Sequence, residues 1–276
     1  MKKIVFPEGN DPRILEAAKV LITEAACHPV LIGDEAEITN ALGEGEYSVV
    51  APDDSDNAVW QGGSMVADDQ ADGIVAGAVF STPDVLRAYI KTIGTAEGVA
   101  RMSSCFLMEK GQERYLFADC GVNIDPSSEV MAETAYLTAQ FAPLLDIDPK
   151  IAFLSFSTKG SASHEVVDKV TEALRITKER WPDLVVDGEL QIDAAIVPEV
   201  AASKAPDSPL KGQATVLIFP NLDAGNMAYK LVERLGGFSA TGPLLLGFAK
   251  PAHDLSRGCS AADIVNAAKI ALKQSS

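Results

Sequence analysis

Short apolar runs alternate with longer segments of helical spacing along most of this chain. Residues 3–6, 29–33 and 73–78 are typical of buried strands, and apolar residues recur at helical spacing between them. The first helical segment begins after Asp11, a favoured N-cap residue, with Pro12 at its first position. This strand–helix alternation predicts an α/β fold with mostly parallel sheets and helices on both faces.

A second series of the same kind begins near Gly98 and reaches the closing helix. The first series also includes a candidate strand at 47–51 and candidate helices at 56–67 and 82–93. The second has candidate strands at 99–107, 114–117, 151–156, 194–198 and 215–219, and candidate helices at 128–141, 163–181, 198–203, 224–235 and 261–273. The segment at 114–119 is typical of the return strand of a hairpin, which adds an antiparallel element.

No linker separates the two series, so the second domain is either inserted in the first or packed closely on it. We predict two α/β domains. The first is discontinuous, residues 1–91 plus 243–276, and the second comprises residues 92–242. A chain of 276 residues is long enough for two domains of ordinary size.

The chain carries a formal net charge of −16, which disfavours nucleic acids and anionic membranes as partners. Any bound anion must therefore be held by a few well-placed arginines and helix ends. No apolar run approaches the roughly 18 residues of a membrane span, and the first residues lack the pattern of a signal peptide. We therefore expect a cytoplasmic protein without membrane contact.

The four cysteines are widely scattered, and none forms a C-x-x-C pair. With only three histidines there is no zinc-binding spacing, so no metal site is expected. Free, buried thiols in a reducing compartment are the simplest interpretation.

Polar groups suited to acid–base chemistry surround a glycine turn near the end of the chain. Ser256, Arg257 and Gly258 precede a predicted helix whose third position is Asp263. An arginine beside a helix N-terminus is suited to holding an anion, and the carboxylate can accept a proton. The alternative is structural: Ser260 and Asp263 fit a capping box, and spacing alone favours that interpretation. Ser256 can likewise be only a turn residue.

A second polar turn follows the candidate strand at 151–156. It contains Ser157, Thr158, Lys159, Gly160 and Ser161. Such a turn directs backbone N–H groups, hydroxyls and an ammonium group beyond the carboxyl end of the strand. An ordinary N-cap in a βα loop explains the same residues, and the Walker A spacing is absent.

Two arginines and one further turn are weaker candidates. Arg13 lies in the first turn of its helix, where a cation opposes the helix dipole. Arg87 is in the helix after a buried strand, and Asn226 follows Gly225 in a turn. Solvent exposure and turn chemistry are the alternatives for these residues.

A series of short motifs extends along nearly the whole chain. It resembles the phosphate acetyltransferases (phosphotransacetylases) through FPEGNDPR at 6–13, DGIVAGA at 72–78, FADC at 117–120, SFSTKGS at 155–161, DGELQIDAA at 187–195, KAPDSP at 204–209, IFP at 218–220, GN at 225–226, YK at 229–230, KP at 250–251 and DLSRG at 254–258. The resemblance is strongest from about Gly73 onward.

This resemblance implies an enzyme that moves an acetyl group between acetyl phosphate and coenzyme A. It also implies two α/β domains with the active site in the cleft between them, a homodimer, and no catalytic metal. Coenzyme A is then a substrate, and no cofactor is permanently bound. A propionyl or butyryl version of the reaction remains an alternative, as does a weakly active paralogue that only binds the ligands.

The resemblance also implies roles for particular residues. Asp263 matches the general base that deprotonates the thiol, Arg257 the phosphate-binding arginine, and Ser256 the serine that supports the transition state. Arg13 and Arg87 match arginines in or near the substrate cleft. We also expect substrate contacts from Ser157, Thr158, Lys159, Gly160, Ser161, Asn226 and Tyr229.

The sequence departs from the family pattern in two ways. Between Gly33 and Asp72 it is a few dozen residues shorter than the usual member, and the missing part normally carries a helical segment and a ligand-binding arginine. Leu246 and His253 stand where the family usually has glutamine and asparagine. We expect these two side chains to line the approach to the glycine turn and to alter acyl preference.

Overall fold

The chain divides into two compact units, Met1–Ala100 with Thr241–Ser276 and Arg101–Ala240. The computed structural model describes residues 1–53 and 57–275. Asp56, where the sequence predicts a helix start, lies outside the described residues. Within those residues no helix is both long enough and apolar enough to cross a membrane.

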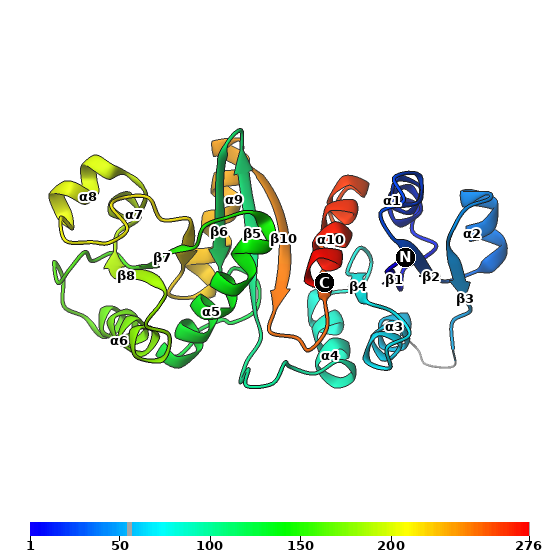
Figure 1. Ribbon diagram of the computed structural model, residues 1–276, viewed down its shortest axis with the longest axis horizontal. Coiled ribbons are helices and arrows are strands. Elements are labelled where there is room, and N and C mark those ends of the chain that lie inside the picture. The colour runs from blue at the N-terminus through cyan, green and yellow to red at the C-terminus, as the bar shows by residue number, and fades with distance from the viewer. Residues whose placement is uncertain (54–56, 276) are drawn as a thin grey trace. The chain divides into compact units, whose positions relative to one another are not determined.

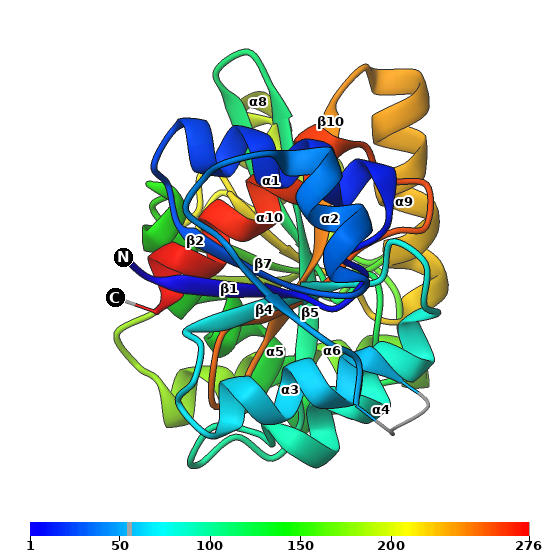
Figure 2. The same cartoon turned by 90° about the vertical axis from the view of Figure 1, so that its right-hand side faces the viewer.

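The first unit contains a parallel sheet covered on both faces by helices. Its strand order is β11-β4-β1-β2-β3, and every pair is parallel. The strands are β1 (Lys3–Phe6), β2 (His28–Ile32), β3 (Ser48–Val50), β4 (Gly73–Ala76) and β11 (Ala252–Asp254). The helices are α1 (Pro12–Thr23), α2 (Glu35–Leu42), α3 (Ala58–Ala67), α4 (Thr82–Thr92) and α10 (Ala261–Gln274). Helices α1 and α10 pack together on one face, and α3 and α4 on the other (Figures 1 and 2).

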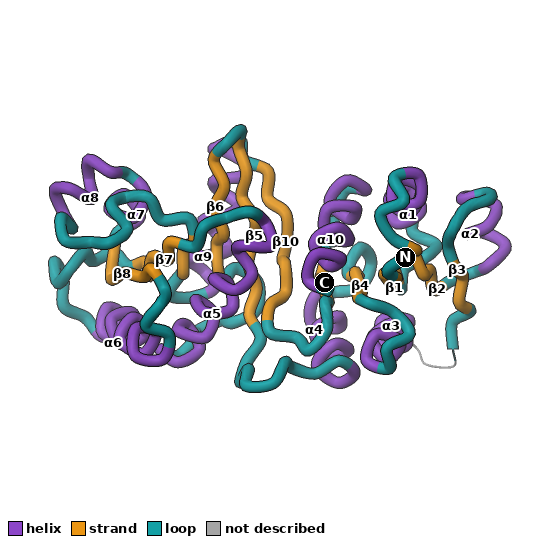
Figure 3. The backbone as a smooth tube through the Cα atoms, in the orientation of Figure 1, coloured by secondary structure: helices purple, strands orange, loops and turns teal. Residues whose placement is uncertain are grey.

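The second unit is built on a mixed sheet of order β10-β5-β6-β9-β7-β8. Its strands are β5 (Ser103–Lys110), β6 (Glu113–Ala118), β7 (Lys150–Leu154), β8 (Val185–Leu190), β9 (Val216–Ile218) and β10 (Ser239–Leu246). Its helices are α5 (Ser128–Phe141), a 3-10 turn at Ala142–Leu145, α6 (Glu165–Arg180), α7 (Ile192–Ile196), α8 (Pro198–Lys204) and α9 (Leu222–Gly236). Strands β5 and β6 form the expected antiparallel hairpin, and β6, β9, β7 and β8 are parallel. Figure 3 shows β5 and β6 side by side. The chain returns to the first unit within β10.

The α/β class with mostly parallel sheets and covering helices is therefore confirmed. One predicted strand is wrong, because residues 194–198 fall in α7 and the start of α8. A short apolar run of this kind fits a buried helix as well as a strand, and its alanines favour the helix. Strand β8 was missed because it contains Asp187 and Glu189. Both acids are buried, at 2% and 3% exposure, which an isolated sequence pattern does not reveal.

Candidate active site

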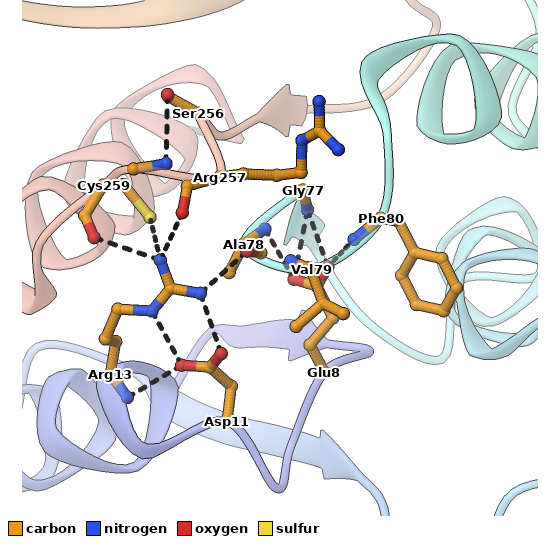
Figure 4. Close-up of polar contacts among 11 residues, drawn as sticks. Glu8, Asp11, Arg13, Gly77, Ala78, Val79, Phe80, Ser256, Arg257 and Cys259 are labelled. Carbon is orange, nitrogen blue, oxygen red and sulfur yellow. Dashed lines mark hydrogen bonds and ion pairs between the residues drawn. The ribbon is translucent and has the colours of Figure 1, made fainter.

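The glycine turn predicted from the sequence follows β11 and leads into α10. We call residues 256–259 the catalytic turn, after the role that the sequence predicts for them. Ser256, Arg257 and Gly258 are exposed, whereas Cys259 is buried. Cys259 N donates to Ser256 O at 2.8 Å, and Gly258 N donates to Ser256 Oγ at 3.3 Å. The guanidinium of Arg257 makes no hydrogen bond or ion pair with any described residue, so its donors remain open to an anion (Figure 4).

The capping box predicted for Ser260 and Asp263 is present at the start of α10. Asp263 Oδ2 accepts from Ser260 N and Ser260 Oγ, both at 2.8 Å, while Asp263 N donates to Ser260 Oγ at 3.3 Å. Asp263 Oδ1 has no hydrogen-bond partner within the described part of the chain. Capping therefore uses one carboxylate oxygen and leaves the other available to accept a proton.

Arg13 lies in the first turn of α1 and extends to the catalytic turn (Figure 4). Its Nε and Nη2 donate to the two oxygens of Asp11 at 3.0 and 2.8 Å. Nη2 also donates to Ala78 O at 2.7 Å, and Nη1 donates to Arg257 O at 2.7 Å and Cys259 O at 3.2 Å. The hydrogen bond from Arg13 holds the pKa of the Asp11 carboxyl below its usual range.

Glu8 is a functional candidate that the sequence reasoning missed. Its carboxylate is 7% exposed and accepts hydrogen bonds from the backbone N–H groups of Gly77, Ala78, Val79 and Phe80 at 2.7–3.2 Å (Figure 4). We call these four groups the amide cradle. No pattern in the sequence signalled this carboxylate, because the surrounding loop, Pro7 to Asp11, is polar and typical of a surface loop.

The loops after β1, β2, β3 and β4 border an open, shallow pocket of about 290 Å³ at the carboxyl ends of these strands. It is lined by Pro7, Glu8, Gly9, Asn10, Asp11, Ile32, Gly33, Pro52, Ala58, Val79 and Phe80. Parallel α/β sheets bind ligands at this edge. The amide cradle and the loop that carries Arg13 therefore border a ligand-sized space.

Buried Asp254 lies in β11, two residues before Ser256. Its Oδ2 accepts from Thr82 Oγ1 at 2.6 Å, and Oδ1 has no hydrogen-bond partner in the described chain. Burial raises the pKa of Asp254 to about 7, against a lowering by the Thr82 hydrogen bond. This acid is the second functional candidate that no sequence spacing signalled.

Arg87 lies on the surface of α4. Its side chain is 65% exposed and forms an ion pair with Asp84 at 3.0 Å. Solvent weakens an exposed pair of this kind, so the Arg87 guanidinium is only weakly held by Asp84.

The polar turn at 157–161 is held by residues of β8. Lys159 Nζ bonds Asp187 Oδ1 at 2.5 Å and Gly188 O at 2.8 Å, while Glu189 Oε1 accepts from Ser157 Oγ at 2.8 Å and Gly160 N at 2.7 Å. The cation and one amide of the turn are thus already paired with carboxylates. The Ser157 and Thr158 side chains are buried, whereas Gly160 and Ser161 are exposed.

Helix α9 contributes the two remaining candidates. Asn226 Nδ2 donates to Cys120 O at 3.2 Å. The ring of Tyr229 stacks on Phe106 with 3.9 Å between centroids. Burial raises the pKa of Tyr229.

The expectation for Leu246 and His253 is wrong. Leu246 is 3% exposed and His253 is fully buried, so neither lines an open approach to the catalytic turn. His253 Nδ1 accepts from Leu245 N at 3.1 Å, and burial lowers the pKa of His253 to about 4. Both residues lie in buried strands, and a comparison of residue types at two positions does not show whether a side chain is buried.

The chain matches the model of the family described as Phosphate acetyl/butaryl transferase, in two segments at residues 1–57 and 50–272. It is 43% identical to the phosphate acetyltransferase of Bacillus subtilis (strain 168), over 99% of this chain and 94% of that protein. A phosphotransacetylase from Streptococcus pyogenes superimposes with a TM-score of 0.94 at 44% identity, covering 99% of this chain and 94% of that one. The EutD phosphotransacetylase from Staphylococcus aureus superimposes with a TM-score of 0.91 at 39% identity, covering 100% of this chain and 94% of that one.

The comparisons also agree with a shortened first unit. The alignment with the Bacillus protein spans 304 positions, more than the 276 residues of this chain, so that relative has residues without counterparts here. The family match divides at residues 50–57, inside the interval between Gly33 and Asp72. Sequence, fold and order of motifs agree, and the chain belongs to the phosphate acetyl/butaryl transferase family.

Proposed function

We propose that this protein transfers an acetyl group between acetyl phosphate and coenzyme A. One observation carries the proposal. The Arg257 guanidinium, which has no partner among the described residues, lies in the catalytic turn, and the open oxygen Oδ1 of Asp263 lies in the first turn of the helix that follows, α10. The turn thus combines a site for an anion with a proton acceptor. The names of the relatives support acetyl phosphate and coenzyme A as the substrate pair.

In this mechanism Asp263 Oδ1 accepts the proton of the coenzyme A thiol. The thiolate forms a bond to the carbonyl carbon of acetyl phosphate, and the bond from that carbon to the phosphate oxygen breaks. Arg257 stabilises the charge on the departing phosphate, and Ser256 Oγ donates a hydrogen bond to the carbonyl or phosphate oxygen. Because the arginine supplies the positive charge, we propose neither a catalytic metal nor a permanently bound cofactor.

We also propose substrate-binding roles for Arg87, the turn at 157–161, Asn226 and Tyr229. Arg87 is supported by its exposed and weakly held guanidinium. The turn is supported by the exposure of Gly160 and Ser161. The two units are proposed to correspond to the two predicted domains.

A cytoplasmic location is proposed as well. All four cysteines are free and buried, which suits a reducing compartment.

Turnover of acyl phosphates tests the function directly. We expect purified protein to form thioester from coenzyme A and acetyl phosphate, measured by absorbance of the thioester, with propionyl and butyryl phosphate as parallel substrates. Faster turnover of butyryl phosphate would favour the short-chain alternative. Ligand binding without turnover of any acyl phosphate by folded protein would favour the binding paralogue, for which the shortened region near residues 50–57 is the supporting observation.

We propose that the protein forms a homodimer through α9. Met227, Leu231 and Leu235 recur at four-residue spacing along this helix and are 58%, 56% and 82% exposed. Such a stripe is more apolar than a solvated helix face requires.

Substitution of Leu231→Glu places a charge on this stripe without entering a core, and we expect it to dissociate the dimer. Light scattering after size exclusion gives the mass of each species. Ile90→Glu on α4, where the side chain is 44% exposed, is the matched control and should remain dimeric. A dimeric Leu231→Glu variant would place the interface elsewhere.

A further inference from the structure

The hydrogen bonds of Arg13 leave it no free donor. A guanidinium carries five N–H groups, and five oxygen acceptors surround this one: two oxygens of Asp11 and the carbonyls of Ala78, Arg257 and Cys259, with Cys259 Sγ a sixth acceptor at 3.9 Å from Nη1. We propose that Arg13 is a positioning residue that fixes the catalytic turn, and that it does not bind substrate directly. The inference rests on the proposed function, because it assigns Arg13 a part in that reaction.

The catalytic turn needs an external restraint. Three of its residues are exposed, and Gly258 at its centre has open space around it, with only Ser256 Oγ within 4 Å of a Cβ built there. Within the turn itself only two hydrogen bonds are formed, both to Ser256. Arg13 Nη1 bonds the carbonyls on either side of Gly258, so it restrains the main chain from which the Arg257 side chain projects.

Asp11 fixes the orientation of the guanidinium. Its Oδ1 accepts from Arg13 N at 2.8 Å and from Nε, and its Oδ2 accepts from Nη2. Asp11 is also the N-cap of α1, and its side chain is only 10% exposed. The ion pair therefore fixes the plane of the Arg13 guanidinium relative to the N-terminus of α1. A lysine ammonium at position 13 cannot make the same set of hydrogen bonds. It also compensates the cation placed against the helix dipole.

The same arginine ties the turn to the loop after β4. Arg13 bonds Ala78 O, and Glu8, from the loop that precedes α1, bonds Ala78 N and the rest of the amide cradle. The carbonyl and the amide of Ala78 are thus held by residues from one short segment, Glu8 to Arg13 (Figure 4). These hydrogen bonds consequently fix the positions of the loops after β1, β4 and β11 relative to one another, next to Arg257.

Arg13→Lys tests the proposal. We expect kcat to fall by roughly ten- to hundredfold, as for a catalytic group displaced by a fraction of an ångström to an ångström, with the KM of both substrates changed by less than about twofold. Amide hydrogen exchange at residues 257–259 should become faster. This readout needs no activity, so an inactive wild-type protein would refute the proposed function while exchange still tests the role of Arg13.

A double-mutant cycle separates positioning from direct binding. If Arg13 acts through Arg257, Arg13→Lys should reduce the residual activity of an Arg257→Ala variant by no more than about twofold. A large rise in KM, or losses that multiply in the double variant, would overturn the proposal. So would unchanged kcat and exchange in Arg13→Lys.

Arg114→Lys is the matched control. Arg114 is 32% exposed, compared with 30% for Arg13, and it also joins a carboxylate, Glu109, to a main-chain carbonyl, Leu145 O. We expect similar destabilisation but unchanged kcat and unchanged exchange at 257–259. If Arg13→Lys does not fold, Asp11→Asn provides the second variant. It keeps one acceptor for α1, removes the bidentate pair and should produce the same faster exchange and lower kcat.

Discussion

Replacement of Asp263 by asparagine should reduce turnover by roughly 10²- to 10⁴-fold while the protein remains folded. The loss is expected because an amide cannot accept the thiol proton. The fold should persist because the amide oxygen can still accept from Ser260 N, as Asp263 Oδ2 does at 2.8 Å. The stability change should therefore stay within about 1 kcal/mol, the usual range for a cap substitution. Steady-state kinetics and urea unfolding of the same preparation measure the two effects.

Asp34→Asn is the control for the cap. Asp34 is the N-cap of α2, and its Oδ1 accepts from Glu37 N at 2.8 Å. This variant changes a helix-capping carboxylate to an amide in the same unit and should keep full turnover. If Asp263→Asn instead unfolds the protein while its folded fraction retains normal specific activity, the carboxylate is only a cap.

Asp254→Asn should stabilise the protein by roughly 1–3 kcal/mol at pH 8, measured by urea unfolding, because the raised pKa is worth about 4 kcal/mol and a buried amide N–H group in place of Oδ1 costs part of it. The folded pKa of Asp254 is about 7 and the ordinary pKa of an aspartate is 3.8, so the folded state binds the extra proton between these values. The contribution of the neutral acid is fully present below pH 3.8 and is lost as pH rises through 7. Asparagine mimics the neutral acid and can still accept from Thr82, so the gain should disappear near pH 4.

The adjacent His253 acts in the opposite direction over nearly the same range. Its folded pKa is about 4 and the ordinary pKa of a histidine is 6.5, so its buried neutral form favours folding above pH 6.5. That contribution is lost as pH falls towards 4. In the Asp254→Asn variant, the free energy of unfolding should therefore rise with pH between 4 and 6.5.

Asp187→Asn is the contrasting control for this pH experiment. Asp187 is as buried as Asp254, at 2% against 1% exposure, but it bonds Lys159. Removing its charge should lower stability at pH 8, because it breaks a paired interaction. Equal or lower stability of Asp254→Asn at pH 8 would mean that its ionised form has a partner in solution.

Local patterns predicted those features whose partners are near in sequence. Strand–helix alternation indicated the fold class, and the three-residue spacing of Ser260 and Asp263 indicated the capping box. The hydrogen-bond partners of Arg13 could not be predicted, because its acceptors at Ala78, Arg257 and Cys259 are 65 to 246 residues away in the sequence. The spacing of apolar residues indicates which face of a helix or strand is buried. It does not indicate which distant carbonyl lies next to a guanidinium.

Burial of charged groups was the other property that the sequence concealed. Glu8, Asp187 and Asp254 are typical surface acids by residue type, yet each is less than 8% exposed. Their burial depends on partners supplied by other loops and strands. The motifs quoted from the sequence contained these residues, but only the fold identifies their bonding partners.

The carboxylate of Glu8 occupies the amide cradle. Four consecutive amides such as those of Gly77 to Phe80 would otherwise attract an anion, and Arg13, which bonds the carbonyl of Ala78, also bonds the carbonyls of the catalytic turn. Because the Glu8 side chain fills the cradle, these amides do not compete with the Arg257 guanidinium for an anion. In the proposed reaction we therefore expect product phosphate and acyl phosphate to bind the same guanidinium, which suits a reaction that runs in both directions.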